Sequence, residues 1–267
     1  MSDDSQFIPN VHFELIPIKN LVSNQQYQRN LSLGHVRKVA ENFNLCQINP
    51  VKVSRRDGIN YVFNGQHTIE IVAAVSGSRE TPVWCMIYDD LDYRTEAEIF
   101  ANQQRYVKKL TPFEIFMANI EAGSDDQIII KSLAESFGVK ITSNSSLEGG
   151  ICCISTLEGI YRKYGIHVLE RSLRLCIGSW EGESNSLSAS MIKGVAKLVV
   201  TFGDSLRDEV FKEKVGRLSI REIVRTAKER RAGSLGYAEA MLLAYNSKKT
   251  HSQLQMDKLY SENNQQK

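Results

Sequence analysis

The sequence predicts an α+β fold, in which an N-terminal domain with a small mixed sheet is followed by an all-helical C-terminal region. Strand and helix patterns mix over roughly the first hundred residues, whereas strand patterns largely stop after about residue 94. From there on, helix starts with capping-box spacing recur. The length of 267 residues suits two domains, and an apolar content of 42% provides a core for each.

Four runs in the N-terminal domain have the character of strands, and they cover residues 15–21, 51–55, 59–63 and 81–88. The Asp57-Gly58 pair between the second and third runs is typical of a two-residue β-hairpin turn. Helices are expected over residues 36–43 and 69–75, where apolar side chains share one face. The second of these helices is expected to end at Gly77.

Helix boundaries in the second half are marked by capping side chains and by glycines. Starts are expected at four pairs with capping-box spacing, which are Thr95 and Glu98, Thr111 and Glu114, Ser124 and Gln127, and Ser155 and Glu158. Stops are expected at Gly123, Gly138, Gly165, Gly178 and Gly203. The predicted organisation is a domain over 1–110, a helical region over 111–255 and a disordered tail over 256–267.

The charge and cysteine content narrow the class of protein. The 33 basic and 31 acidic residues give a formal net charge of +2, so any nucleic-acid surface must be local. The five cysteines and five histidines show no metal-binding spacing, and a reducing compartment fits them best. The acidic, polar N-terminus and the absence of an apolar run of roughly 18 residues predict a cytoplasmic protein that does not bind membranes.

A candidate functional site lies at the turn Gly65-Gln66-His67-Thr68, between a predicted strand and a predicted helix. The N-terminus of a helix offers unpaired backbone N–H groups and a partial positive charge, both of which favour a bound anion. Gly65 allows the backbone to approach a ligand closely, and the three residues after it add polar side chains. The alternative is a tight turn whose glycine is needed sterically and whose histidine packs or lies at the surface.

Polar residues elsewhere are placed to join this turn. Arg29 precedes the first predicted helix. Three more polar residues lie near the end of the helix that follows the last strand, and they are Asn102, Gln104 and Arg105. Because ligands collect where elements end, we expect these side chains to share one phosphate- or nucleotide-binding pocket with the turn.

Five short motifs follow one another over about residues 13–118. They are Ile16-Pro17-Ile18, Tyr27-Gln28-Arg29, Asn49-Pro50-Val51, Phe63-Asn64-Gly65-Gln66-His67-Thr68, and Asn102-Gln103-Gln104-Arg105 ahead of Leu110-Thr111-Pro112. Their order resembles the ParB/sulfiredoxin-like superfamily, and within it the ParB-type N-terminal domains often called ParB-like nuclease domains. The pattern is most similar to the "Gly-Gln-His" proteins of this kind from phages and mobile elements.

The resemblance implies a nucleoside triphosphate with Mg²⁺ as ligand, and DNA as a partner. Carried over by position, it implies nucleotide contacts for Arg29, Gly65, Gln66, His67, Asn102 and Arg105. Gln66 stands where sulfiredoxins carry a nucleophilic cysteine, so sulfinic-acid reduction is not expected. Thr68 and Ala101 replace a basic and an acidic residue of the family motifs, which weakens the case for metal binding and hydrolysis.

Candidates for DNA contact lie after the nucleotide motifs. A helix-turn-helix follows the third motif in ParB proteins, and residues 125–141 offer a comparable segment, with plain helical packing as the alternative. Five basic residues are candidate contacts to a phosphate backbone, namely Lys108, Lys109, Arg221, Arg225 and Lys228. A solvated helix face is the alternative explanation of the last three.

The leading hypothesis is a ParB-like DNA-associated protein, acting in partition, regulation or mobile-element maintenance, whose N-terminal domain binds a nucleotide or a nucleic-acid phosphate. An alternative is a nuclease or nucleoside triphosphatase in which Arg29 and Arg105 stabilise developing charge, with no catalytic base nominated. A third hypothesis is an interaction scaffold that has lost the ligand. The expected partners are DNA, a nucleotide and a second copy of the chain.

Overall fold

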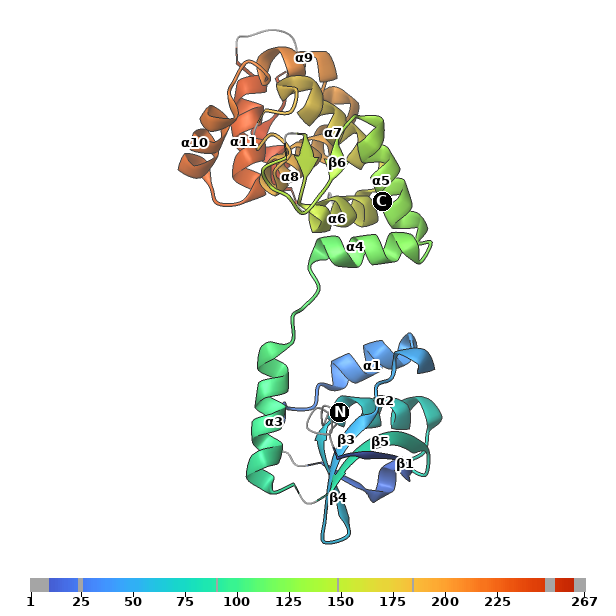
Figure 1. Cartoon of the computed structure of the whole chain (residues 1–267). Coiled ribbons are helices and arrows are strands. Elements are labelled where there is room, and N and C mark those ends of the chain that lie inside the picture. The colour runs from blue at the N-terminus through green and yellow to red at the C-terminus, as the bar shows by residue number, and fades with distance from the viewer. Residues whose placement is uncertain are drawn as a thin grey trace, which may run out of the picture. The chain divides into compact units, whose positions relative to one another are not determined.

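The computed structural model describes residues 10–23, 26–89, 91–147, 149–183, 185–247 and 253–261, apart from the side chain of Gln104. The chain forms two compact units, Met1–Lys108 and Lys109–Lys267 (Figure 1). The first unit mixes strands and helices and the second is mainly helical, which confirms the predicted α+β fold class. Among the described helices, none combines the length and apolar character that crossing a bilayer requires.

The N-terminal unit is built on a five-stranded mixed sheet. Its strands are β1 (His12–Pro17), β2 (Leu21–Ser23), β3 (Val51–Arg56), β4 (Ile59–Asn64) and β5 (Pro82–Asp89), in the order β1-β5-β3-β4-β2. β1–β5 and β3–β4 are antiparallel, whereas β3–β5 and β2–β4 are parallel. The run predicted as one strand over residues 15–21 is two strands on opposite edges of the sheet, because the 3-10 turn η2 (Ile18–Asn20) separates them.

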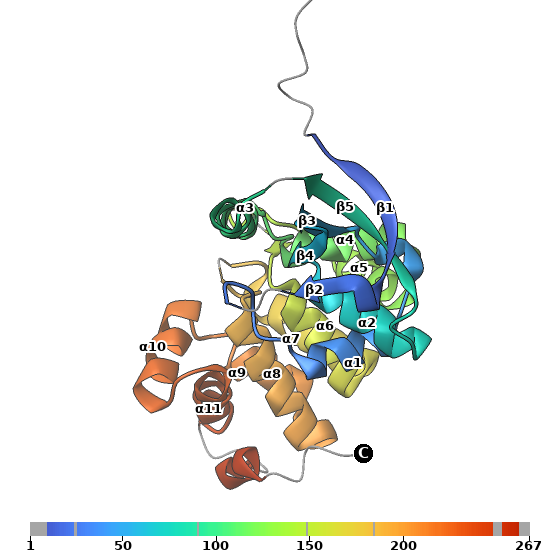
Figure 2. The same cartoon turned by 90° about the horizontal axis from the view of Figure 1, so that it is seen from below.

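One face of the sheet is covered by α2 (Gln66–Ser76), with α1 (Leu33–Glu41) beside that helix (Figures 1 and 2). Ile69 and Val72 of α2 belong to an apolar cluster with strand residues such as Val53. The chain from α1 to β3 passes through a short 3-10 turn, η3 (Leu45–Gln47). The turn between β3 and β4 has positive φ angles at both Asp57 and Gly58, 50° and 74°, as the predicted hairpin requires.

The other face of the sheet carries α3 (Tyr93–Tyr106) over its β3–β4 half. Side chains alternate along a strand, so Arg56 and Phe63 lie on the opposite face from Val53. Arg56 meets Glu96 of α3 there. The helix begins two residues before the predicted start at Thr95, because the Asp92 carboxylate accepts the Thr95 N–H at 2.7 Å and caps the first turn.

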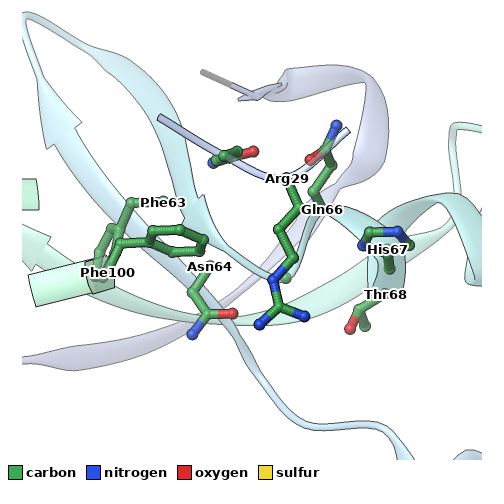
Figure 3. A pocket seen from close by; sticks show the side chains of 9 residues that line it. Arg29, Phe63, Asn64, Gln66, His67, Thr68 and Phe100 are labelled. Carbon is green, nitrogen blue, oxygen red and sulfur yellow. The ribbon is translucent and has the colours of Figure 1, made fainter. Parts of the chain in front are cut away.

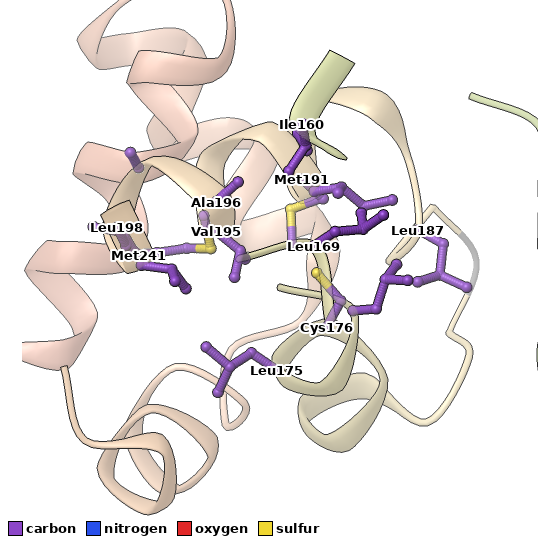
Figure 4. Packing of buried hydrophobic residues seen from close by; sticks show 14 of the residues in the cluster. Ile160, Leu169, Leu175, Cys176, Leu187, Met191, Val195, Ala196, Leu198 and Met241 are labelled. Atoms are coloured by element: carbon purple, nitrogen blue, oxygen red, sulfur yellow. The ribbon is translucent and has the colours of Figure 1, made fainter. Parts of the chain in front are cut away.

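The C-terminal unit packs its helices around one apolar core. The described α-helices are α4 (Pro112–Glu121), α5 (Asp125–Ser136), α6 (Ile154–Tyr164), α7 (Ile166–Trp180), α8 (Ala189–Phe202), α9 (Asp208–Lys214), α10 (Ile220–Arg230) and α11 (Ser234–Tyr245), with the 3-10 turn η4 (Gly203–Ser205) after α8. Leu169 and Cys176 of α7 meet Met191 and Val195 of α8 in this core, and Met241 of α11 completes it (Figure 4).

Several predicted helix boundaries need correction. Thr111 and Glu114 form the expected capping box, whereas α6 begins at Ile154 rather than at Ser155. Gly178 lies inside α7 instead of ending it. A Cβ at Gly178 would be 3.1 Å from Cε of Lys212, so the Lys212 side chain packs closely over this glycine within the helix.

The segment 125–141 is not a helix-turn-helix. It contains α5 and the short strand β6 (Lys140–Ile141), which pairs in parallel with β7 (Gly150–Ile151). The next helix begins only at Ile154. Ile151 is fully buried and Ile141 nearly so, so packing into the core holds this stretch extended and the region is not wholly helical.

The predicted disordered tail over 256–267 begins too early. Residues Met256–Tyr260 form the 3-10 turn η5, with Leu259 buried and the Tyr260 hydroxyl donating to Glu239 at 2.7 Å. Apolar burial and this hydrogen bond hold the turn against α11. Residues 262–267 lie outside the described part of the chain.

Candidate functional site

The turn at Gly65 joins the end of β4 to the start of α2. Gly65 is the N-cap of the helix and has a left-handed conformation, with φ at 114°. A Cβ at this position would lie 3.2 Å from Cα of Val51 and 3.1 Å from its Cγ1, so only glycine fits between β3 and the helix. Within the described part of the chain no side-chain hydrogen bond caps α2, and the first N–H groups of a helix have no partner in the helix itself.

A pocket of about 200 Å³ opens at this helix end (Figure 3). It is lined by Gln28, Arg29, Phe63, Asn64, Gly65, Gln66, His67, Thr68 and Phe100. Five of the eight predicted ligand contacts are in this set, the four residues of the turn and Arg29. The partly exposed ring of Phe100, backed by the fully buried Phe63, forms an apolar wall, and none of these lining residues is acidic.

Arg29 brings the one positively charged group of this lining to the pocket. Its side chain extends past the start of α2, and in Figure 3 the guanidinium points to the same side as Asn64 and Thr68. A guanidinium donates several hydrogen bonds in a geometry that matches phosphate oxygens. The pocket therefore combines a helix N-terminus with a permanent cation.

His67 links the pocket to α1. Its Nε2 accepts the backbone N–H of Ser32, the N-cap residue of α1, at 3.2 Å, and its ring lies 5.5 Å from that of His35. Burial lowers the pKa of His67, and electrostatic interaction with His35 and Arg29 lowers it further. The imidazole is therefore neutral at pH 7 with its proton on Nδ1, and only that nitrogen remains as a donor.

Gln28 and Gln66 both line the pocket. The Gln28 amide donates to the carbonyl of Val62, and its oxygen accepts the Ser23 hydroxyl at 2.8 Å. These two bonds hold the segment that carries Arg29 against β4 and β2. Gln66 is 9% exposed at the first position of α2, so its side chain is largely withdrawn from solvent.

The predicted third motif contributes through residues other than those named from the sequence. Asn102 and Arg105 are exposed on α3 and do not line the pocket, and the Arg105 guanidinium lies 5.7 Å from the Tyr106 ring. The side chain of Gln104 lies outside the described residues. Instead, the side-chain oxygen of Gln103 accepts a hydrogen bond from the side-chain amide of Asn64 at 3.0 Å.

Phe100 and Gln103 could have been found from helical spacing. Together with Glu96 they follow an i, i+4, i+7 pattern, which places all three on one face of α3. The burial of Glu96 identifies that face as the one turned to the sheet. The order of motif letters alone does not indicate which residues of α3 face the sheet, whereas the helical period does.

α3 is held in place by a buried charge pair. The Glu96 carboxylate is fully buried, 2.9 Å from Nε of Arg56, and it accepts the Tyr27 hydroxyl at 3.3 Å. Burial and the negative charge of Glu96 raise the pKa of Tyr27. The Tyr27 ring lies 5.6 Å from that of Phe100, so this cluster places the aromatic wall of the pocket.

None of the basic residues proposed for DNA contact lines this pocket. Arg221, Arg225 and Lys228 are exposed along one face of α10, and the buried residues Ile223 and Ala227 hold its other face in the core. Lys108 and Lys109 are exposed between α3 and α4. Among the described residues, no group of three or more histidines, cysteines or carboxylates is arranged to hold a metal ion.

Comparison with known proteins gives a family and a distant structural likeness. Residues 22–258 match the model of a family described as "Family of unknown function (DUF6551)". No curated protein sequence matches the chain. A crystal structure of the C-terminally truncated chromosome-partitioning protein ParB from Caulobacter crescentus, complexed with CTP-gamma-S, is similar at 15% identity and a TM-score of 0.37, over 86% of this chain and 99% of that one.

Proposed function

Because the chain belongs to the DUF6551 family of unknown function, we propose its function from the site: the N-terminal unit binds the phosphate groups of a nucleotide, within a DNA-associated protein. The observation that carries this proposal is the uncapped N-terminus of α2, which opens into the pocket beside Arg29. The order of the sequence motifs, which resembles that of ParB-type domains of the "Gly-Gln-His" kind, supports the same function.

The phosphate groups are proposed to lie against the start of α2. The N–H groups of Gln66, His67 and Thr68 point out of the helix, and its dipole adds a partial positive charge. Arg29 supplies a full charge at the same place. The neutral His67 adds the Nδ1 proton as a further donor, so the anion meets donors on several sides.

The base and sugar are proposed to lie toward the aromatic wall. Phe100, which is partly exposed, gives the pocket an apolar side next to its polar one, and the fully buried Phe63 lies behind that surface. Inorganic phosphate has no part that would use such a surface, whereas a nucleobase stacks on aromatic rings. The mixed lining therefore favours a nucleotide over a simple anion.

Mg²⁺ fits this pocket only through the nucleotide. The described lining residues provide no carboxylate, so the protein offers none of the charged oxygens that usually hold this ion. A bound Mg²⁺ would be coordinated by phosphate oxygens and water. The same lining has no carboxylate to act as a base, which favours nucleotide binding over hydrolysis as the proposed role.

Calorimetry with a panel of nucleoside di- and triphosphates, with and without Mg²⁺, tests this proposal. We expect at least one triphosphate to bind the wild type, and Arg29→Ala to weaken that binding about 10- to 100-fold, since a hydrogen bond to a charged group contributes about 1.5–3 kcal/mol. Arg37→Ala, which removes an exposed arginine of α1 outside the pocket, is the control and should bind normally. Wild-type protein that binds no member of the panel would refute the proposal.

DNA association is proposed to use the basic face of α10. The affinity for random duplex DNA should fall as salt rises. A plot of log K against log salt concentration should fall with a slope of about 0.9 for each phosphate contact. Replacing Arg221, Arg225 and Lys228 together by alanine should lower the slope by up to about 3. The pair Arg162→Ala and Lys163→Ala, exposed on α6, is the control. If the wild type shows no measurable binding to duplex DNA at low salt, the proposed DNA association is wrong.

A further inference from the structure

We propose that two copies of this chain pair through β1, edge to edge and antiparallel, with Phe13 of each copy opposite Phe13 of the other. β1 is at the edge of the sheet, and within the described residues its only strand neighbour is β5 (Figure 2). An edge strand presents backbone N–H and C=O groups that another strand can satisfy. This interface is independent of the nucleotide pocket, which no residue of β1 lines.

The direction of the backbone groups identifies which residues face the open edge. Ile18 follows β1 directly, and its N–H donates to Thr81 at 3.1 Å, on the β5 side. Backbone groups alternate in direction along an antiparallel strand, so those of Ile16, Glu14 and His12 also point to β5. The N–H and C=O groups of Phe13 and Leu15 therefore point outward. The backbone of Pro17 also faces the open edge, but proline has no N–H to donate there.

Only one register of the symmetric pair suits the residues of β1. Centring the two-fold axis on Glu14 places two carboxylates opposite each other, and centring it on His12 does the same for two imidazoles. Centring it on Leu15 puts Pro17 at a position that must donate a hydrogen bond. With Phe13 on the axis, each His12 lies opposite the other copy's Glu14, and only residues with an N–H face the partner strand.

The apolar surface agrees with this register, and the other copy's Glu14 would join the contacts that His12 already makes in its own chain, with Glu14 at 3.0 Å and Asp89 at 3.3 Å. Hydrogen bonds from Arg55 lower the pKa of Glu14 to about 2, so its charge is permanent at neutral pH. On the other face, Phe13, Leu15 and the neighbouring Trp84 are 51%, 53% and 55% exposed. In the pair, Phe13 packs against Phe13 and Leu15 against Val11, so one apolar strip crosses the axis.

The mass of the protein in solution, measured by light scattering across a dilution series, tests the pairing. We expect the wild type to reach twice the 30.2 kDa of one chain. Phe13→Glu should stay monomeric, because it places two carboxylates on the axis, and its half-exposed side chain is not needed for folding. Val22→Glu, 45% exposed on the opposite edge strand, should dimerise like the wild type. A monomeric wild type, or a dimer that survives Phe13→Glu, would overturn the proposal.

Disulfide trapping tests the register without relying on a disruptive variant. Facing residues of a hydrogen-bonded pair have Cα atoms about 5.5 Å apart, within the reach of a disulfide. With Cys46 and Cys152, the exposed cysteines, changed to serine, Phe13→Cys should form a disulfide-linked dimer on oxidation. Leu15→Cys should not, because the two copies of that position are roughly 14 Å apart. Equal cross-linking of both, or cross-linking of Leu15→Cys alone, would contradict the register.

Discussion

Gly65→Ala is expected to remove nucleotide binding and to destabilise the N-terminal unit by about 1–3 kcal/mol, the usual range for a residue forced into an unfavourable backbone conformation. The left-handed φ of 114° is strained for any side chain, and the new methyl group would press on the backbone of Val51. Relief of this contact would move the start of α2, whose N–H groups form the proposed phosphate site. Amide hydrogen exchange of peptides from residues 10–89 measures the stability, and calorimetry measures the affinity.

Gly77→Ala is the matched control for this prediction. Gly77 is at the other end of the same helix, with φ at 69°, and an added Cβ would meet nothing within 4 Å. The Gly77→Ala variant should have a free energy of unfolding lower by about 1 kcal/mol, from backbone strain alone, and should keep its nucleotide affinity. Equal loss of affinity in the two variants would show that general destabilisation, and not the shape of the turn, explains the effect at Gly65.

Glu96→Gln is expected to destabilise the packing of α3 on the sheet by about 3 kcal/mol, because it leaves the Arg56 guanidinium without its charged partner. This is the lower end of the range for buried pairs, since Arg56 is 26% exposed and water partly replaces the lost carboxylate. Hydrogen exchange in α3 should accelerate. Nucleotide affinity should fall as well, because Phe100 is held on the same helix face.

Glu98→Gln makes the same chemical change two residues along, at an exposed position of α3. It should leave exchange in the helix unchanged, because an exposed carboxylate contributes little to stability. If hydrogen exchange in α3 accelerates equally in both variants, the cause is the loss of a negative charge that interacts with the helix dipole. Loss of the buried pair would then not be the cause. If neither differs from wild type, Arg56 and Glu96 do not anchor α3.

Local chemistry in the sequence was enough to predict the turns and the position of the Gly65 turn where the candidate pocket opens. The Asp57-Gly58 hairpin, the helix after Gly65 and the capping box at Thr111 depend on backbone conformations that few residue types adopt. Their positions therefore follow from the residues alone. The placement of Arg29 beside the Gly65 turn was also expected, because both lie where an element begins.

Long-range packing decided the features that the sequence analysis missed. Phe100 and Gln103 face the site because Glu96, on the same face of α3, is buried against the sheet by its ion pair with Arg56, forty residues away in sequence. The extended pair β6–β7 exists because Ile141 and Ile151 find a place in the core. The helical spacing that places Phe100 and Gln103 on one face with Glu96 is local, whereas the partners that bury Glu96 and Ile151 lie outside any short window of sequence.

The two edge strands of the sheet also separate what local sequence determines from what tertiary packing determines. Sequence by itself determined that β-like residues precede Leu21 and that the chain is α+β, since alternation and turn residues are local properties. Only the tertiary structure decided that residues 12–17 and 21–23 lie on opposite edges, which leaves β1 with an open side. The order of strands in a sheet depends on contacts between distant residues, and each contact is chosen by the packing of the whole unit rather than by its own sequence.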